Sequence, residues 1–99
     1  MLNIEKKTNG SELTVALSGR LDTTTAPELE KQIKESVGGV ENLVMDLQAL
    51  EYISSAGLRV LLSAQKIMNR QGSMAVTHVS ETIMEIFEVT GFSDILNIE

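Results

Sequence analysis

Residues 43–62 read LVMDLQALEYISSAGLRVLL, and this stretch decides the fold. It begins with a short apolar run, Leu43–Met45, which is typical of a buried strand. From Leu58 onward the apolar residues recur at helical spacing. Between the two lie a polar connection over residues 46–52 and a pair of serines, 54 and 55. A strand that passes through a polar turn into an amphipathic helix indicates an α/β fold.

The segments before this stretch begin with two short strands. The sequence predicts strands over residues 2–7 and 12–18, joined by an Asn9-Gly10 turn into an antiparallel hairpin. A helix follows, because Thr25 and Glu28 stand in the pattern of a capping box ahead of apolar residues at helical spacing.

The segments after it continue the alternation of strands and helices. We expect a strand over residues 73–78, a helix from Ser80 to Gly91 and a last short strand over 93–98. This order predicts an α/β fold with a mixed, mostly parallel sheet that opens with an antiparallel hairpin and has helices packed on it. With no linker in the pattern, residues 1–99 are expected to form a single domain.

Composition narrows the class of protein. The chain has 99 residues, no cysteine and a net charge of −6, so thiol chemistry is excluded and direct nucleic-acid binding is not expected. No apolar run approaches the roughly 20 residues of a membrane span, and the first residues lack the apolar stretch of a secretory signal. We therefore expect a cytoplasmic protein, and a monomer.

The two serines stand where a strand turns into a helix. The first turn of a helix has free backbone amides and a partial positive charge, which favour a phosphate there. Serine is also a preferred helix cap, and Ser54 alone is enough for that role. A cap explains one serine and leaves Ser55 free. A phosphate on it would add roughly −1.5 to −2 charges to the local surface.

A hydrolase nucleophile elbow is the alternative interpretation of Ser55. Gly57 lies two residues after it, but Ile53, not glycine, lies two residues before it. The general base would have to be His78, the sole histidine, with Asp46 or Asp94 as its partner. The sequence does not favour this function. No cluster of histidine and carboxylate residues has metal-ligand spacing, so no metal, cofactor or catalytic residue is expected.

Four blocks of the chain together resemble the STAS domains, and among them the bacterial anti-sigma factor antagonists. The blocks stand in family order and spacing and cover nearly the whole chain. They are Leu17-Ser18-Gly19-Arg20-Leu21-Asp22, Leu43-Val44-Met45-Asp46-Leu47, Tyr52-Ile53-Ser54-Ser55-Ala56-Gly57-Leu58 and Phe87-Glu88-Val89-Thr90-Gly91-Phe92.

The resemblance implies a phosphorylation switch. Such proteins, when unphosphorylated, bind an anti-sigma factor that is itself a serine kinase, and so release a sigma factor. The kinase phosphorylates one serine at the helix start, binding is lost, and a serine phosphatase reverses the step. The family pattern there is Asp-Ser-Ser/Thr-Gly-Leu, which places the phosphorylated serine on Ser55. Ser54 replaces the family aspartate and Ala56 the second hydroxyl residue.

The resemblance also implies a partner surface around this serine. Asp22 matches a family residue that lies near the phosphorylated serine and contributes to that surface. The full predicted surface comprises Asp22, Thr23, Ser54, Ser55, Gly57, Leu58 and Arg59. The alternative is a constitutive STAS scaffold in a signalling complex, without phosphorylation, which the loss of the family aspartate at Ser54 favours.

Overall fold

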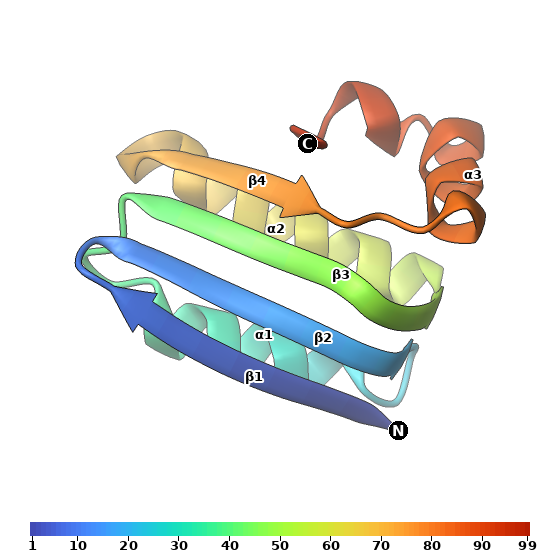
Figure 1. Cartoon of the computed structure of the whole chain (residues 1–99), viewed down its shortest axis with the longest axis horizontal. Helices are drawn as coiled ribbons and strands as arrows, with labels where there is room; N and C mark the ends of the chain where they lie inside the picture. The colour runs from blue at the N-terminus through green and yellow to red at the C-terminus, as the bar shows by residue number, and fades with distance from the viewer.

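The computed structural model describes residues 1–99 and contains one four-stranded sheet (Figure 1). The strands lie in the order β1-β2-β3-β4. β1 pairs antiparallel with β2, and β2, β3 and β4 are parallel to one another. The predicted mixed, mostly parallel sheet is confirmed. Along the chain the elements are β1 (Leu2–Asn9), β2 (Glu12–Leu21), α1 (Ala26–Ser36), β3 (Asn42–Ile53), α2 (Ser55–Gln71), β4 (Ser73–Thr77), α3 (Glu81–Thr90) and the 3-10 helix η1 (Phe92–Asp94).

The predicted antiparallel hairpin forms, but its turn lies one residue later than the expected Asn9-Gly10 pair. Asn9 and Glu12 face each other at its end, so Gly10 and Ser11 make the turn. Gly10 has a φ of +63°, a backbone conformation that tight hairpins require and glycine adopts without steric cost.

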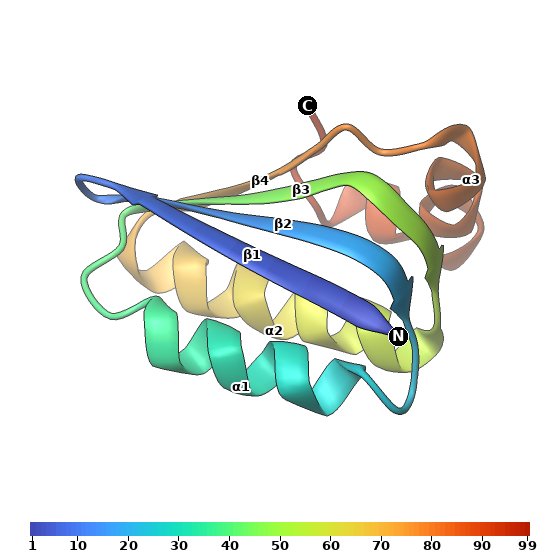
Figure 2. The same cartoon turned by 60° about the horizontal axis from the view of Figure 1, so that its bottom comes forward.

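The helices lie on one face of the sheet and leave the other face open (Figure 2). α1 and α2 run side by side beneath the strands, and α3 lies near the carboxyl ends of β3 and β4. The core sits between sheet and helices. Its largest fully buried side chains are Phe87, Leu17, Leu21, Leu29, Leu43, Met45, Leu47, Leu61, Met68, Met74, Ile83 and Val15.

β3 is longer than the sequence predicts. The expected connection over residues 46–52 continues the strand, which pairs with β2 as far as Ile53. The register between the two strands shifts at two points, and Gln48 and Ala49 are both exposed. Such irregularities break the alternation of buried and exposed residues by which a strand is recognised. Leu47, Leu50 and Ile53 are therefore buried at a spacing of three.

The predicted last strand over residues 93–98 is wrong. Backbone hydrogen bonds of Asp94 to Gly91 and of Ile95 to Phe92 form the 3-10 turn instead. The segment meets the sheet at a single parallel bridge between Ile98 and Val76, in which the Val76 amide donates to the Asn97 carbonyl and the Glu99 amide donates to the Val76 carbonyl. The apolar residues in this segment led to the expectation of a strand, but the 3-10 turn takes up its first residues, and Leu96 after the turn is buried in the core.

Candidate functional site

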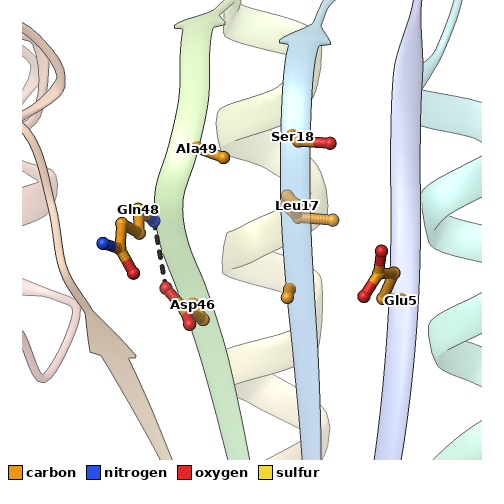
Figure 3. A pocket seen from close by; sticks show the side chains of 7 residues that line it. Glu5, Leu17, Ser18, Asp46, Gln48 and Ala49 are labelled. Atoms are coloured by element: carbon orange, nitrogen blue, oxygen red, sulfur yellow. Dashed lines mark hydrogen bonds between the residues drawn. The ribbon is translucent and has the colours of Figure 1, made fainter.

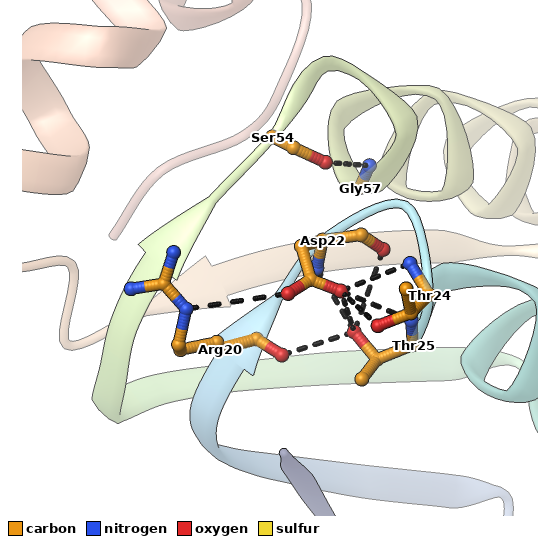
Figure 4. Close-up of polar contacts among 6 residues, drawn as sticks. All are labelled: Arg20, Asp22, Thr24, Thr25, Ser54 and Gly57. Carbon is orange, nitrogen blue, oxygen red and sulfur yellow. Dashed lines mark hydrogen bonds and ion pairs between the residues drawn. The ribbon is translucent and has the colours of Figure 1, made fainter.

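The carboxyl ends of β2 and β3 meet at the start of α2 (Figure 4). The amide of Ser54 donates a hydrogen bond of 2.9 Å to the carbonyl of Leu21, the last residue of β2. This bond brings the loop after β2, which carries Asp22 and Thr23, to the serines at the start of α2. In open parallel sheets this edge is where binding groups gather.

Ser54 is the N-terminal cap of α2. Its backbone is extended, and its Oγ accepts a hydrogen bond of 3.4 Å from the amide of Gly57. Its carbonyl accepts the first helical hydrogen bond, from Leu58, at 2.9 Å. Ser55 is then the first helical residue and is exposed, with no hydrogen bond from its hydroxyl. The structure thus separates the two serines into one structural and one free hydroxyl.

Gly57 allows α2 to begin close to the sheet. A Cβ at this position would lie 2.7 Å from Cγ of Leu21 and 2.9 Å from Cγ1 of Ile53, closer than side chains tolerate. Gly57 is buried, and Leu58 is only 5% exposed. These two residues of the predicted partner surface therefore lie beneath it, whereas Thr23 and Arg59 are exposed.

Asp22 organises the loop between β2 and α1. Its Oδ1 accepts hydrogen bonds from the amide and hydroxyl of Thr24, at 3.0 and 2.7 Å, and from the amide of Thr25, at 3.2 Å. The Thr24 hydroxyl bond, followed by the backbone bonds, holds the pKa of Asp22 below its ordinary value because these donors favour the charged carboxylate. Asp22 therefore stays ionised at neutral pH.

The predicted capping box at Thr25 and Glu28 is wrong. Thr25 makes no side-chain cap, because its backbone is already helical. Its hydroxyl instead donates a hydrogen bond of 3.0 Å to the carbonyl of Arg20. The side chain of Asp22, three residues earlier, accepts the hydrogen bond from the Thr25 amide that Glu28 would accept in a capping box. The Asp22 carboxylate and the Thr25 hydroxyl, which accepts a hydrogen bond of 2.9 Å from the Asp22 amide, hold the loop together.

Arg20 and Tyr52 form a pair that the sequence did not reveal. They are partners in the β2–β3 register, and the Arg20 guanidinium lies 4.3 Å from the centroid of the Tyr52 ring. Arg20 Nε also lies 4.0 Å from Oδ2 of Asp22. Both residues stand in blocks that resemble the family, but only the register after two bulges brings them together.

The residues of the alternative hydrolase site are not assembled. His78 Nδ1 lies 3.1 Å from Oδ1 of Asp46, so a histidine–aspartate pair does exist. Asp46, however, is seven residues before the end of β3 at Ile53, which places the pair roughly 20 Å from Ser55 along the strand. Asp94 lies in η1. Ser55 therefore has no base within reach.

The open sheet face holds a shallow depression of about 210 Å³ (Figure 3). Glu5, Asp46 and Gln48 are its polar side chains beside Ser18, and the remaining lining residues are Ala16, Leu17 and Ala49. Asp46 Oδ1 accepts a hydrogen bond from the amide of Gln48 at 3.0 Å.

No group of three or more histidine, cysteine, aspartate or glutamate side chains is placed to hold a metal ion. No helix of the structure combines the length and the apolar character that a membrane crossing requires.

The sequence profile of the STAS domain matches residues 3–99. The chain belongs to the STAS domain family. Two curated relatives are named anti-sigma-B factor antagonist. The protein from Bacillus subtilis strain 168 is 29% identical over 98% of this chain and 90% of its own length. The protein from Staphylococcus aureus strain NCTC 8325 is 30% identical over 98% of this chain and 92% of its own length.

Solved STAS-fold structures superpose closely on this chain. An anti-sigma factor antagonist from Mycobacterium paratuberculosis matches with a TM-score of 0.89 and 24% identity, over 99% of this chain and 85% of that one. The Bacillus cell fate determinant SpoIIAA in its phosphorylated form matches with a TM-score of 0.77 and 16% identity, over 98% and 91%. These likenesses establish the fold that the four sequence blocks predict.

Proposed function

We propose that this STAS domain is an anti-sigma factor antagonist that phosphorylation of Ser55 switches off. Unphosphorylated, it binds an anti-sigma factor with serine kinase activity and so releases a sigma factor. A serine phosphatase restores the binding form. The names of the two curated relatives support the class of function. The protein acts in the cytoplasm, by binding and not by catalysis, as one domain over residues 1–99.

The observation that carries the proposal is the division of roles between the two serines. Ser54 uses its hydroxyl to cap α2, which leaves Ser55 exposed at the first helical position. A phosphate on Ser55 would stand at the helix N-terminus, where free amides and the helix dipole favour negative charge. The fold would therefore tolerate the modification. The added charge would act on the partner surface formed by Asp22, Thr23 and Arg59.

The test is incubation with candidate anti-sigma kinases and ATP, followed by intact-mass measurement. We expect one added phosphate on the wild type and none on Ser55→Ala. Ser54→Ala should still accept phosphate, because Ser54 serves as the helix cap and not as the phosphorylated residue. Ser55→Asp should lose binding to the kinase while its melting temperature stays at or above that of the wild type. Phosphate that persists on Ser55→Ala would contradict the assignment of the site.

A constitutive scaffold is the second candidate, because Ser54 replaces the aspartate of the family pattern. In that case the same surface binds its partner without a kinase step. A stable complex in which Ser55 acquires no phosphate with any kinase would favour it. Mass spectrometry of protein taken from its own cells separates the two, since a phosphate in the peptide from Tyr52 to Arg59 excludes the unmodified scaffold.

A further inference from the structure

Arg20 and Tyr52 form an exposed pair on the open face of the sheet, beside the start of α2. Their chain neighbours Leu21 and Ile53 are buried, at 0% and 2% exposure, and point toward the helices. Side chains of adjacent strand residues point to opposite faces, and the Arg20 guanidinium lies over the Tyr52 ring, so both side chains lie on the face away from the helices. The Arg20 side chain is 55% exposed and Tyr52 is 37% exposed.

The geometry leaves the hydrogen-bond donors of Arg20 available. The guanidinium lies against the Tyr52 ring, and its Nε faces Asp22 at 4.0 Å. The structure gives neither Nη group a hydrogen-bond acceptor. A guanidinium that lies over an aromatic ring and keeps two free donor groups can receive a carboxylate in bidentate geometry.

Tyr52 adds an apolar contact surface at the same place. The chain has three aromatic residues, Tyr52, Phe87 and Phe92. Phe87 is fully buried and Phe92 packs against the core, so Tyr52 is the exposed aromatic ring. Tyrosine and arginine are enriched among the few residues that carry most of the binding energy of protein interfaces.

We propose that Arg20 and Tyr52 anchor the anti-sigma factor, which places a carboxylate on the Arg20 guanidinium and apolar surface on the Tyr52 ring. The inference rests on the proposed function and extends the partner surface from the helix start onto the open sheet face. The positive charge of Arg20 indicates that the partner contributes a negatively charged group. In a chain of net charge −6, Arg20 presents a cation to the partner beside the serine switch.

This anchor explains how one phosphate prevents binding. Ser55 follows Tyr52 by three residues, so their Cα atoms lie within about 11 Å of each other. A phosphate on Ser55 brings roughly −1.5 to −2 charges into that neighbourhood. Charges within the screening length of about 8 to 10 Å still repel each other at ordinary salt. A phosphate on Ser55 should therefore weaken the contact of a partner carboxylate with Arg20, most strongly at low salt.

The experiment measures the dissociation constant of the anti-sigma factor complex for a set of variants. Arg20→Gln should weaken binding at least about tenfold, as expected for an interface anchor. Arg20→Lys keeps the charge but not the planar fork of donors and should give an intermediate loss. Tyr52→Leu should weaken binding and Tyr52→Phe should not. Arg70→Gln is the matched control, because Arg70 is an exposed arginine at the far end of α2.

Salt dependence separates a binding role from a structural one. For the wild type, affinity should fall as salt is raised, because the contact joins opposite charges. In Arg20→Gln this dependence should become shallower, an effect that a merely misfolded variant does not show. Melting curves of each variant verify that the fold is kept.

The outcomes distinguish the two proposals. If Arg20→Gln and Arg20→Lys bind the anti-sigma factor with the affinity and salt dependence of the wild type, the anchor is overturned and the proposed function stays intact. Equal weakening by Arg70→Gln also overturns it, because the effect is then one of net charge. A wild type that binds no anti-sigma factor overturns the proposed function, and the anchor with it.

Discussion

The Ser54 amide and the Leu21 carbonyl form a hydrogen bond of 2.9 Å that ties the start of α2 to the end of β2. The bond joins two segments that lie more than thirty positions apart in the sequence. Asp22 follows one of its partners and Ser55 follows the other. The bond therefore holds the loop carrying Asp22 next to the exposed serine, and substitutions that disturb this contact should affect both.

Substitution of Gly57 tests the close approach of α2 to the sheet. Gly57→Ala places a methyl group 2.7 Å from Cγ of Leu21, so we expect a loss of about 1–3 kcal/mol in the free energy of unfolding. Gly38→Ala is the control, because a Cβ there meets nothing within 4 Å. Urea denaturation gives both values. Equal stability of the two variants would show that the helix start has room to shift.

The two serines should differ in their effect on stability. Ser54→Ala removes the cap and should cost about 0.5–2 kcal/mol, toward the lower end because the Oγ to Gly57 amide distance is 3.4 Å. Ser55→Ala should change the free energy of unfolding by less than about 0.5 kcal/mol, because its hydroxyl makes no contact and alanine favours helix. Thermal unfolding of the pair is the measurement. The reverse order would mean that Ser55 is the cap.

The lowered pKa of Asp22 predicts acid sensitivity. The pKa of Asp22 in the folded state is below its ordinary value of 3.8, chiefly because the Thr24 hydroxyl donates a hydrogen bond to the carboxylate. A carboxyl group with such a lowered pKa stabilises the fold at pH values above its pKa in the unfolded chain. Its contribution is complete above about pH 4 and is lost as pH falls through the folded pKa. The stability difference between wild type and Asp22→Asn should therefore shrink below pH 4. Asp94→Asn controls for the loss of one negative charge, and a difference that stays constant with pH contradicts the prediction.

The main elements of the fold were predictable because local patterns determined them. The alternation in residues 12–18 and the helical spacing after Leu58 appear in the structure as β2 and α2. The second half of β3 was not predictable, because its bulges disturb the two-residue period of buried positions. The strand prediction for residues 93–98 was wrong for a related reason, since apolar residues such as Leu96 are buried there without forming a strand.

The candidate site was predictable one segment at a time. The capping role open to Ser54 and the freedom of Ser55 follow from local preferences, and the structure gives Ser54 that role. The contact of Arg20 with Tyr52 depends on the register of two strands, which a single sequence does not determine. The Asp22 network replaced the expected cap at Thr25 because a carboxylate three residues earlier competes for the same amide. Partner-surface roles stay predictions.

Restoring the family aspartate at position 54 tests whether the serine found there affects the stability of the fold or recognition by the kinase. Aspartate caps helices about as well as serine, and its charge at a helix N-terminus adds about 0.3–1 kcal/mol. Ser54→Asp should therefore be more stable than the wild type, and more stable than the uncharged cap in Ser54→Asn, which is the matched control. High salt should reduce the gain, because charge–dipole effects are screened. A variant no more stable than Ser54→Asn would show that the charge at this cap contributes nothing, and any effect of the aspartate on phosphorylation of Ser55 would then belong to kinase recognition.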